Sequence, residues 1–151
     1  MMRIQSLLFT AVVMAFINNA TADTAPADVE IKDLVIENSL TGSAGDPAEG
    51  RKVFADRKLG NCLACHANSE MADQQFHGEV GPSLDGVATR WTEGHLRTIL
   101  VNAKAVFSEE TVMPGFYSLE VGANVRKDLI GKTILSAGQI EDLVAYLQQL
   151  K

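Results

Sequence analysis

Apolar residues recur every three or four positions near the end of the chain. Such spacing places them on one face of an amphipathic helix and leaves polar residues on the other. Ser136 and Gln139 stand three positions apart just before this stretch, in the pattern of a capping box. The sequence therefore predicts a helix that begins after Ser136. Its apolar face consists of Ile140, Leu143, Val144, Leu147 and Leu150, with Tyr146 beside it.

A second amphipathic helix is predicted from residue 47 to about residue 58. Asp46 suits the N-cap, Pro47 suits the first helical position, and Glu49 completes a capping-box arrangement. Small and apolar positions share one face of this helix, and the glycine among them permits close approach of another helix. These positions are Gly50, Val53 and Phe54.

A third helix is predicted over about residues 93–102, after the N-cap residue Thr92. Its apolar face consists of Leu96, Ile99 and Leu100. Glycine and proline punctuate residues 67–90, which we expect to form a loop region. Residues 119–135 contain two glycines and several charges and are expected to form a loop or a short hairpin.

The first residues of the chain predict export. Arg3 supplies a positive charge, Leu7 to Ile17 is a nearly unbroken apolar run, and Ala20-Thr21-Ala22 is a cleavage site that would make Asp23 the new N-terminus. An uncut membrane anchor is the alternative, but a span needs about 20 apolar residues and this run is shorter. The predicted organisation is a signal peptide (1–22), an N-terminal arm (23–45) and one domain (46–151).

The arm has two interpretations. Residues 23–45 are rich in Ala, Asp, Ser and Thr, and their one apolar patch runs from Ile31 to Ile36. They form either an extended arm over residues 29–37 that lies across the domain or a partner, or a disordered lead-in. The sequence leaves both interpretations open.

Cys62-Leu63-Ala64-Cys65-His66 reads C-x-x-C-H, the pattern of covalent haem c attachment. Two thiols add across the two vinyl groups of a haem, and the two-residue gap lets both sulfurs reach one edge of the macrocycle. The histidine that follows then supplies an imidazole nitrogen as the proximal iron ligand. Aromatic residues make up only 6% of the chain, and a haem would supply the missing core volume.

Three other readings of the two cysteines are weaker. A redox dithiol is expected in a βαβ context, and no strand-rich stretch precedes Cys62. A structural zinc site usually needs four ligands, whereas the chain has two cysteines and, beyond His66, only His77 and His95. A disulfide between residues so close together would stabilise little, because it closes almost no loop.

Met113 is the candidate for the second axial ligand. It stands in Thr111-Val112-Met113-Pro114-Gly115-Phe116-Tyr117, where the proline breaks a helix and a loop can present the thioether sulfur inward. A core methionine that fills a gap is the alternative, and His77 is the main competing ligand. Met71 follows His66 too closely to reach the opposite face of the haem, and His95 is expected to be solvated. The carbonyl of Pro82 is a candidate partner for the proximal imidazole, unless Gly81-Pro82 is an ordinary turn.

The charge balance bears on the partners. Cleavage removes Arg3, so the mature chain carries 12 Lys and Arg against 19 Asp and Glu, a net charge of −7. Such a balance argues against nucleic acid or an anionic membrane surface as a partner.

Together these motifs resemble a class I cytochrome c, over about residues 46–151. A narrower resemblance is to the SoxX subunits of SoxAX cytochrome complexes. It rests on the segments 60–66, 81–84, 112–117, 131–136 and 140–147. The resemblance implies an all-α class I cytochrome c fold around one covalent haem c, with an extended N-terminal arm. Carried over, Cys62 and Cys65 hold the haem, His66 is the proximal ligand and Met113 the distal ligand.

The resemblance also implies a role in periplasmic thiosulfate oxidation. In that family a SoxA partner carries a haem with a cysteine ligand, and the complex joins thiosulfate oxidatively to a cysteine of the SoxYZ carrier protein. The electrons pass through haem to a cytochrome c acceptor. The chain would be the electron-transfer subunit of this L-cysteine S-thiosulfotransferase, with no catalytic residue of its own. A general electron-shuttle cytochrome, and a ligand-sensing or peroxidatic cytochrome with a labile Met113, are the alternatives.

Overall fold

The computed structural model describes residues 22–120, 122 and 124–151. The expected signal peptide therefore lies outside the described residues, apart from Ala22. Four α-helices are present in the described part: α1 (Pro47–Ala55), α2 (Val87–Arg90), α3 (Glu93–Val106) and α4 (Ala137–Leu147). Four 3-10 turns accompany them, at Pro26–Asp28, Cys62–Ala64, Ser69–Met71 and Lys127–Leu129. This part of the chain contains no strand beyond one isolated bridge between Lys32 and Val35, so the all-α prediction is confirmed.

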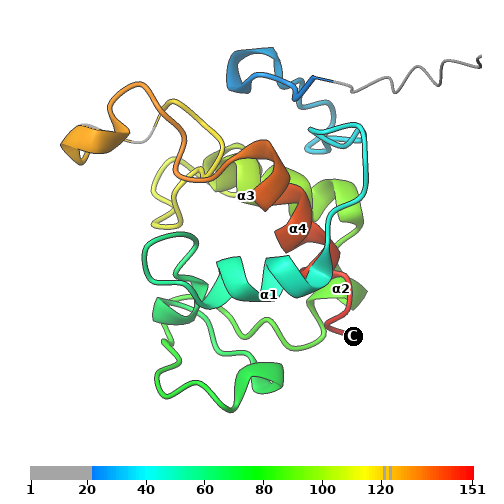
Figure 1. The fold of residues 1–151 in the computed structure, drawn as a ribbon, viewed down its shortest axis with the longest axis vertical. Helices are drawn as coiled ribbons and strands as arrows, with labels where there is room; N and C mark the ends of the chain where they lie inside the picture. Colours follow the sequence, from blue (N-terminus) through cyan, green and yellow to red (C-terminus); the bar gives the residue numbers. More distant parts are fainter. Residues whose placement is uncertain (1–21, 121, 123) are drawn as a thin grey trace, which may run out of the picture.

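Helices α1 and α4 cross in close contact (Figure 1). A Cβ atom added to Gly50 would lie 1.9 Å from the carbonyl oxygen of Asp142 and 2.8 Å from Cβ of Tyr146, so only glycine fits the crossing point. The rings of Phe54 and Tyr146 meet edge to face with their centroids 5.5 Å apart. The backbone N–H of Asp46 donates to the carboxylate of Asp142 at 2.7 Å, which ties the start of α1 to α4. The predicted approach of another helix at Gly50 is therefore present.

The helix ends differ from the predicted ones in three respects. Helix α1 ends at Ala55 rather than near residue 58, because Asp56 leaves the helical conformation. Glu49 does not close a capping box at its start; its side chain pairs with Lys52 instead. Helix α3 continues to Val106 across a break at Asn102, which has φ −154° and ψ 92°. Helix α4 begins as predicted, with both capping-box hydrogen bonds formed between Ser136 and Gln139.

The residues before α1 lie across α3 and α4 and are not a loose lead-in. Ile36 and Leu40 are buried in the core. The N–H of Ile36 donates to the hydroxyl of Thr98 on α3 at 2.9 Å, and the N–H of Leu40 donates to the carboxylate of Glu141 on α4 at 2.9 Å. The segment is not extended throughout, because it turns back between Lys32 and Val35, whose backbones pair with each other.

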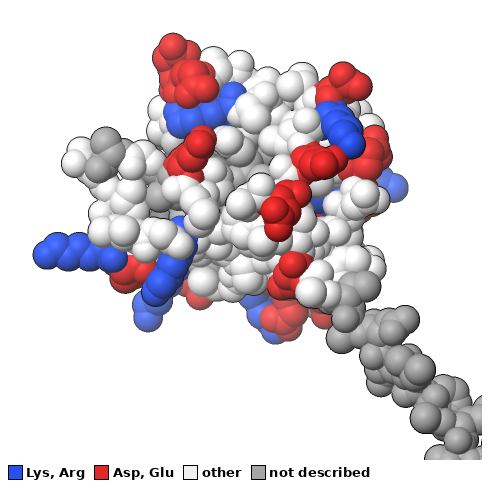
Figure 2. Space-filling model, turned by 90° about the horizontal axis from the view of Figure 1, so that it is seen from above, with Lys and Arg blue, Asp and Glu red and all other residues white. Residues whose placement is uncertain are grey.

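Exposed charges do little to hold this fold. On the face seen in Figure 2, acidic and basic side chains are interspersed, with uncharged surface between them. Exposed pairs such as Glu30 with Lys32 and Arg126 with Asp128 contribute little to stability, because water screens them. No helix among the described residues is long and apolar enough to cross a membrane.

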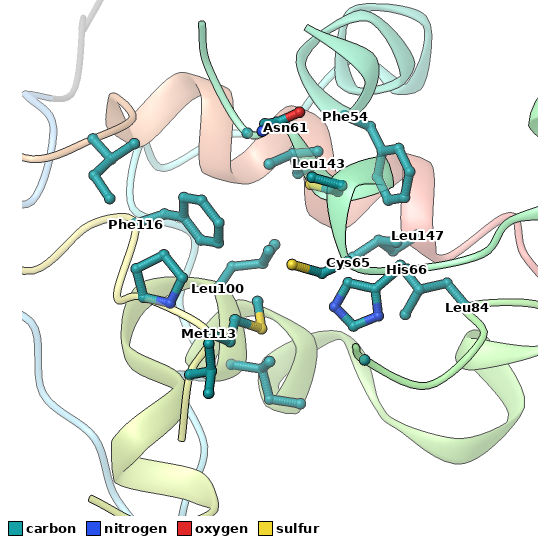
Figure 3. A pocket seen from close by; sticks show the side chains of 18 of the residues that line it. Phe54, Asn61, Cys65, His66, Leu84, Leu100, Met113, Phe116, Leu143 and Leu147 are labelled. Atoms are coloured by element: carbon teal, nitrogen blue, oxygen red, sulfur yellow. The ribbon is translucent and has the colours of Figure 1, made fainter. Parts of the chain in front are cut away.

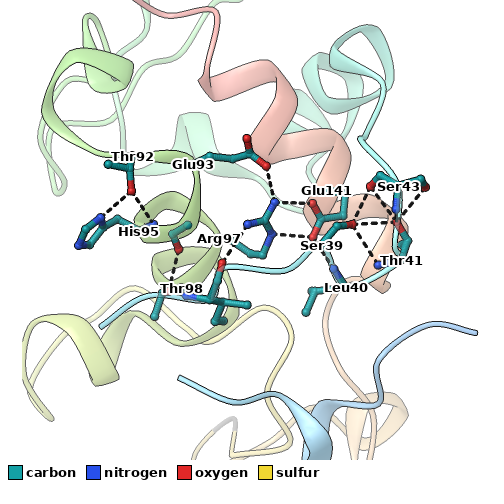
Figure 4. A network of polar contacts seen from close by, with 12 residues as sticks. Ser39, Leu40, Thr41, Ser43, Thr92, Glu93, His95, Arg97, Thr98 and Glu141 are labelled. Atoms are coloured by element: carbon teal, nitrogen blue, oxygen red, sulfur yellow. Dashed lines mark hydrogen bonds and ion pairs between the residues drawn. The ribbon is translucent and has the colours of Figure 1, made fainter. Parts of the chain in front are cut away.

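One ion pair is buried, and the arm is bound to it (Figure 4). The guanidinium of Arg97 donates to both carboxylate oxygens of Glu141, at 2.9 and 3.0 Å. The side chains of Arg97 and Glu141 are only 2% and 3% exposed. The remaining guanidinium nitrogen donates to the carbonyl of Ile36 at 2.9 Å, and Glu93 accepts a further bond at 2.6 Å. Burial acts to lower the pKa of Arg97, but hydrogen bonds and charge attraction from Glu141 and Glu93 outweigh it and raise the pKa.

Arg97→Met is expected to lower the free energy of unfolding by about 3 kcal/mol, because it leaves the Glu141 carboxylate buried without its counter-ion. Urea unfolding of the haem-loaded mature chain measures this change. Lys32→Met is the control, because its pair with Glu30 is exposed, lies away from the cavity, and its loss should leave stability nearly unchanged. An equal effect of both substitutions would show that the buried pair does not hold the arm and the helices together.

Candidate haem site

A cavity of about 700 Å³ lies between α1, α3, α4 and the loops that follow α1 and α3 (Figure 3). Its volume is within the usual range for a bound small molecule or cofactor. Most of its lining is apolar and comes from helices and loops that are far apart in the sequence. The apolar side chains that line it include Phe54, Leu96, Leu100, Phe116, Leu143 and Leu147.

The C-x-x-C-H segment forms one wall of this cavity. Cys62–Ala64 is a 3-10 turn, closed by hydrogen bonds from the N–H groups of Cys65 and His66 to the carbonyl of Cys62. The turn brings both cysteines and His66 to the same cavity. Neither cysteine forms a disulfide. Burial raises the pKa of the Cys62 thiol to about 12, whereas an activated redox dithiol has a lowered thiol pKa.

His66 is held in one orientation by two backbone contacts. Its Nδ1 lies 2.7 Å from the carbonyl oxygen of Pro82. A carbonyl oxygen can only accept, so Nδ1 carries a proton and Nε2 is the nitrogen left to bind a metal. Gly81 packs directly on the ring, since an added Cβ would lie 2.3 Å from Cε1 of His66. The structure therefore gives Pro82 the partner role that the sequence left open.

Met113 enters the same cavity from a different segment, the loop after α3 (Figure 3). It is partly buried against the core. The competing candidates lie elsewhere. Both ring nitrogens of His77 are hydrogen bonded, to the N–H of Asn68 at 3.3 Å and to the carbonyl of Met71 at 3.1 Å. Met71 is a fully buried core residue, and His95 bonds to its N-cap neighbour Thr92.

The residues around the cavity fit a covalently bound haem. Two thiols from one turn, an imidazole and a thioether share an apolar space, and these are the groups that bind a c-type haem with His/Met ligation. The charged residues of the lining are all basic and would suit the propionate groups. These basic residues are Arg57, Lys58, Arg90 and Arg126. The sequence did not reveal them as a group, because they are scattered along the chain and share no regular spacing.

Comparison with known proteins agrees with this geometry. A cytochrome c family model matches residues 47–151. The chain is also similar to a solved structure, the crystal structure of SoxXA from P. pantotrophus, with 42% sequence identity and a TM-score of 0.79. The match covers 86% of this chain and 99% of that chain. No curated protein sequence matches the chain. These likenesses confirm the class I cytochrome c fold and the prediction of covalent haem c.

Gly81→Ala is expected to destabilise the haem-loaded protein by about 1–3 kcal/mol, because the new methyl group overlaps the His66 ring and neither can move freely. The change is measured by urea unfolding, with the haem absorption spectrum as a second readout of strain on the imidazole. Gly138→Ala on α4 is the control: its Cβ would meet nothing closer than 3.9 Å, and alanine favours a helix. If both variants unfold like the wild type, the close packing of Gly81 on His66 is wrong.

Proposed function

Because this chain belongs to the cytochrome c family, and within it to the SoxX cytochromes, we propose that it is the electron-transfer subunit of a SoxAX-type complex that oxidises thiosulfate. The observation that carries the proposal is its likeness to SoxXA over nearly the whole of the matched chain. The complex would act as an L-cysteine S-thiosulfotransferase. The described residues before α1 pack on helices of the same chain. The arm therefore does not by itself point to a partner. The likeness to SoxXA is what favours a subunit over a free electron shuttle.

The proposed reaction joins thiosulfate to a carrier cysteine. A bond forms between the outer sulfur of thiosulfate and the cysteine sulfur, the S–H bond breaks, and one proton and two electrons are released. A bound haem c supplies one-electron oxidation and reduction at its iron. The electrons leave to a cytochrome c acceptor. A SoxA-like haem subunit and a SoxYZ-like carrier are the proposed partners, and the periplasm, reached through a cleaved signal peptide, is the proposed location.

Four residues carry the proposed site. Cys62 and Cys65 form the thioether bonds to haem. His66 binds iron through Nε2, in the orientation fixed by Pro82. Met113 would bind the iron through its thioether sulfur. With His66 and Met113 both bound, the iron would offer no position to a substrate, so the chain would transfer electrons and the sulfur chemistry would take place on the partner. We place this domain at residues 46–151, after an arm at residues 23–45.

Co-purification and reduction test the proposed function. The mature haem-loaded chain is used to capture partners from the periplasm of cells grown on thiosulfate, and the captured proteins are identified by mass spectrometry. We expect a second haem-bearing subunit, and haem reduction when thiosulfate and carrier are added. The variant with Cys62→Ala and Cys65→Ala, which cannot hold haem covalently, is the control for reduction. A chain that is captured alone and is reduced only by general redox proteins would replace this function with that of an electron shuttle.

Met113→Ala is expected to abolish the near-infrared sulfur-to-iron band of the oxidised protein and to lower its reduction potential, because a thioether ligand raises the potential. The haem stays covalently attached, since both cysteines remain. Met71→Leu is the matched control, because Met71 is a buried core residue outside the cavity lining and leucine preserves its bulk. A band that survives in Met113→Ala would exclude Met113 as the ligand.

A further inference from the structure

The break in α3 provides two anchor points for the loop that carries Met113. In an unbroken helix the carbonyls of Leu100 and Val101 would bond to N–H groups four residues later. Because Asn102 is not helical, these carbonyls instead accept from the N–H groups of Phe116 and Tyr117, at 2.9 and 3.3 Å. The chain that leaves the Met113 loop is therefore attached to the broken turn of α3.

Lys104, on the same part of α3, holds the other side of the loop. Its ammonium group donates to the backbone carbonyl of Glu109 and to that of Thr111, the latter at 3.2 Å. Within the described residues, the hydrogen bonds that join residues 108–112 to the rest of the molecule come from Lys104. Val112 is 81% exposed and adds little packing. One lysine thus fixes the segment that immediately precedes Met113.

We propose that Lys104 is a positioning residue for Met113. Its ammonium group holds the backbone two residues before Met113, and the carbonyls of Leu100 and Val101 hold the backbone three and four residues after it. Met113 therefore has restrained chain on both sides, with its sulfur kept in the cavity. Without Lys104 the loop opens more often, and an external ligand then competes with the sulfur for the iron. This inference rests on Met113 being the distal ligand, as proposed above.

Imidazole binding to the oxidised, haem-loaded mature chain tests this role, because imidazole binds only when Met113 leaves the iron. Lys104→Met keeps the aliphatic stem and removes the donors. It should bind imidazole about tenfold more tightly than the wild type, since two hydrogen bonds from a charged, partly exposed donor are lost and the open form becomes more populated. The near-infrared band should weaken in parallel.

Two further variants separate positioning from a general loss of a lysine. Lys104→Arg retains donors for both carbonyls and should restore an affinity close to that of the wild type. Lys52→Met removes an exposed lysine of α1, paired with Glu49, and should leave imidazole affinity unchanged. If Lys104→Met does not yield folded protein, Lys104→Gln, which has a single amide donor group, enters the same comparison with Lys104→Arg.

The outcomes distinguish this inference from the site proposal. Unchanged imidazole affinity in Lys104→Met, or a gain in affinity that Lys104→Arg does not reverse, overturns the role of Lys104. If the near-infrared band also survives in Met113→Ala, the distal-ligand assignment itself fails. If the band is lost in Met113→Ala but is unchanged in Lys104→Met, the distal-ligand assignment stands and only the inference about Lys104 fails.

Discussion

The close crossing of α1 and α4 is the contact on which the rest of the structure depends. At Gly50 the two backbones approach so closely that no side chain fits between them. This contact fixes the end of α1, from which the haem-binding turn follows, against the α4 side chains Leu143 and Leu147 that line the cavity. The edge-to-face contact of Phe54 with Tyr146 and the bond from Asp46 to Asp142 hold the same crossing on either side. The position of the site is therefore a consequence of one glycine-mediated helix contact.

A buried ion pair joins the third helix and the N-terminal segment to this frame. Burying two charges in a protein costs free energy unless their donors and acceptors are hydrogen bonded. Here the hydrogen bonds join Arg97 on α3 and Glu141 on α4 to each other and to the backbone of the arm. Because Arg97 lies next to Leu96 on α3, and Leu96 lines the cavity, the same pair also fixes one cavity wall. The arm therefore contributes to the stability of the domain that holds the haem, which is a role independent of any partner.

The two sides of the site are held in different ways. His66, the proposed proximal ligand, belongs to a short turn, contacts Gly81 closely and bonds to the carbonyl of Pro82, so the backbone itself sets the orientation of the ring. Met113, the proposed distal ligand, stands in a longer loop whose hydrogen bonds come from the broken turn of α3 and from the flexible side chain of Lys104. The cavity therefore has one side chain whose orientation the backbone sets, His66, and one that a loop carries, Met113. An electron-transfer centre benefits from rigidity, because little then needs to rearrange when the charge changes.

Features that depend on neighbouring residues could be predicted from the sequence alone. The capping box at Ser136, the cap at Asp46 and the C-x-x-C-H turn are local patterns, and the structure contains each of them. Features that join distant residues become visible only in the folded chain. The bonds of Glu141 to Arg97 and to Leu40 span 44 and 101 positions, which no local spacing reveals. Helix α3 passes its predicted end because the loop beyond it supplies partners at the break, and the basic cavity lining comes from segments that meet only after folding. Local patterns fix caps and motifs through short-range hydrogen bonds, whereas burial and the pairing of buried charges depend on which surfaces meet.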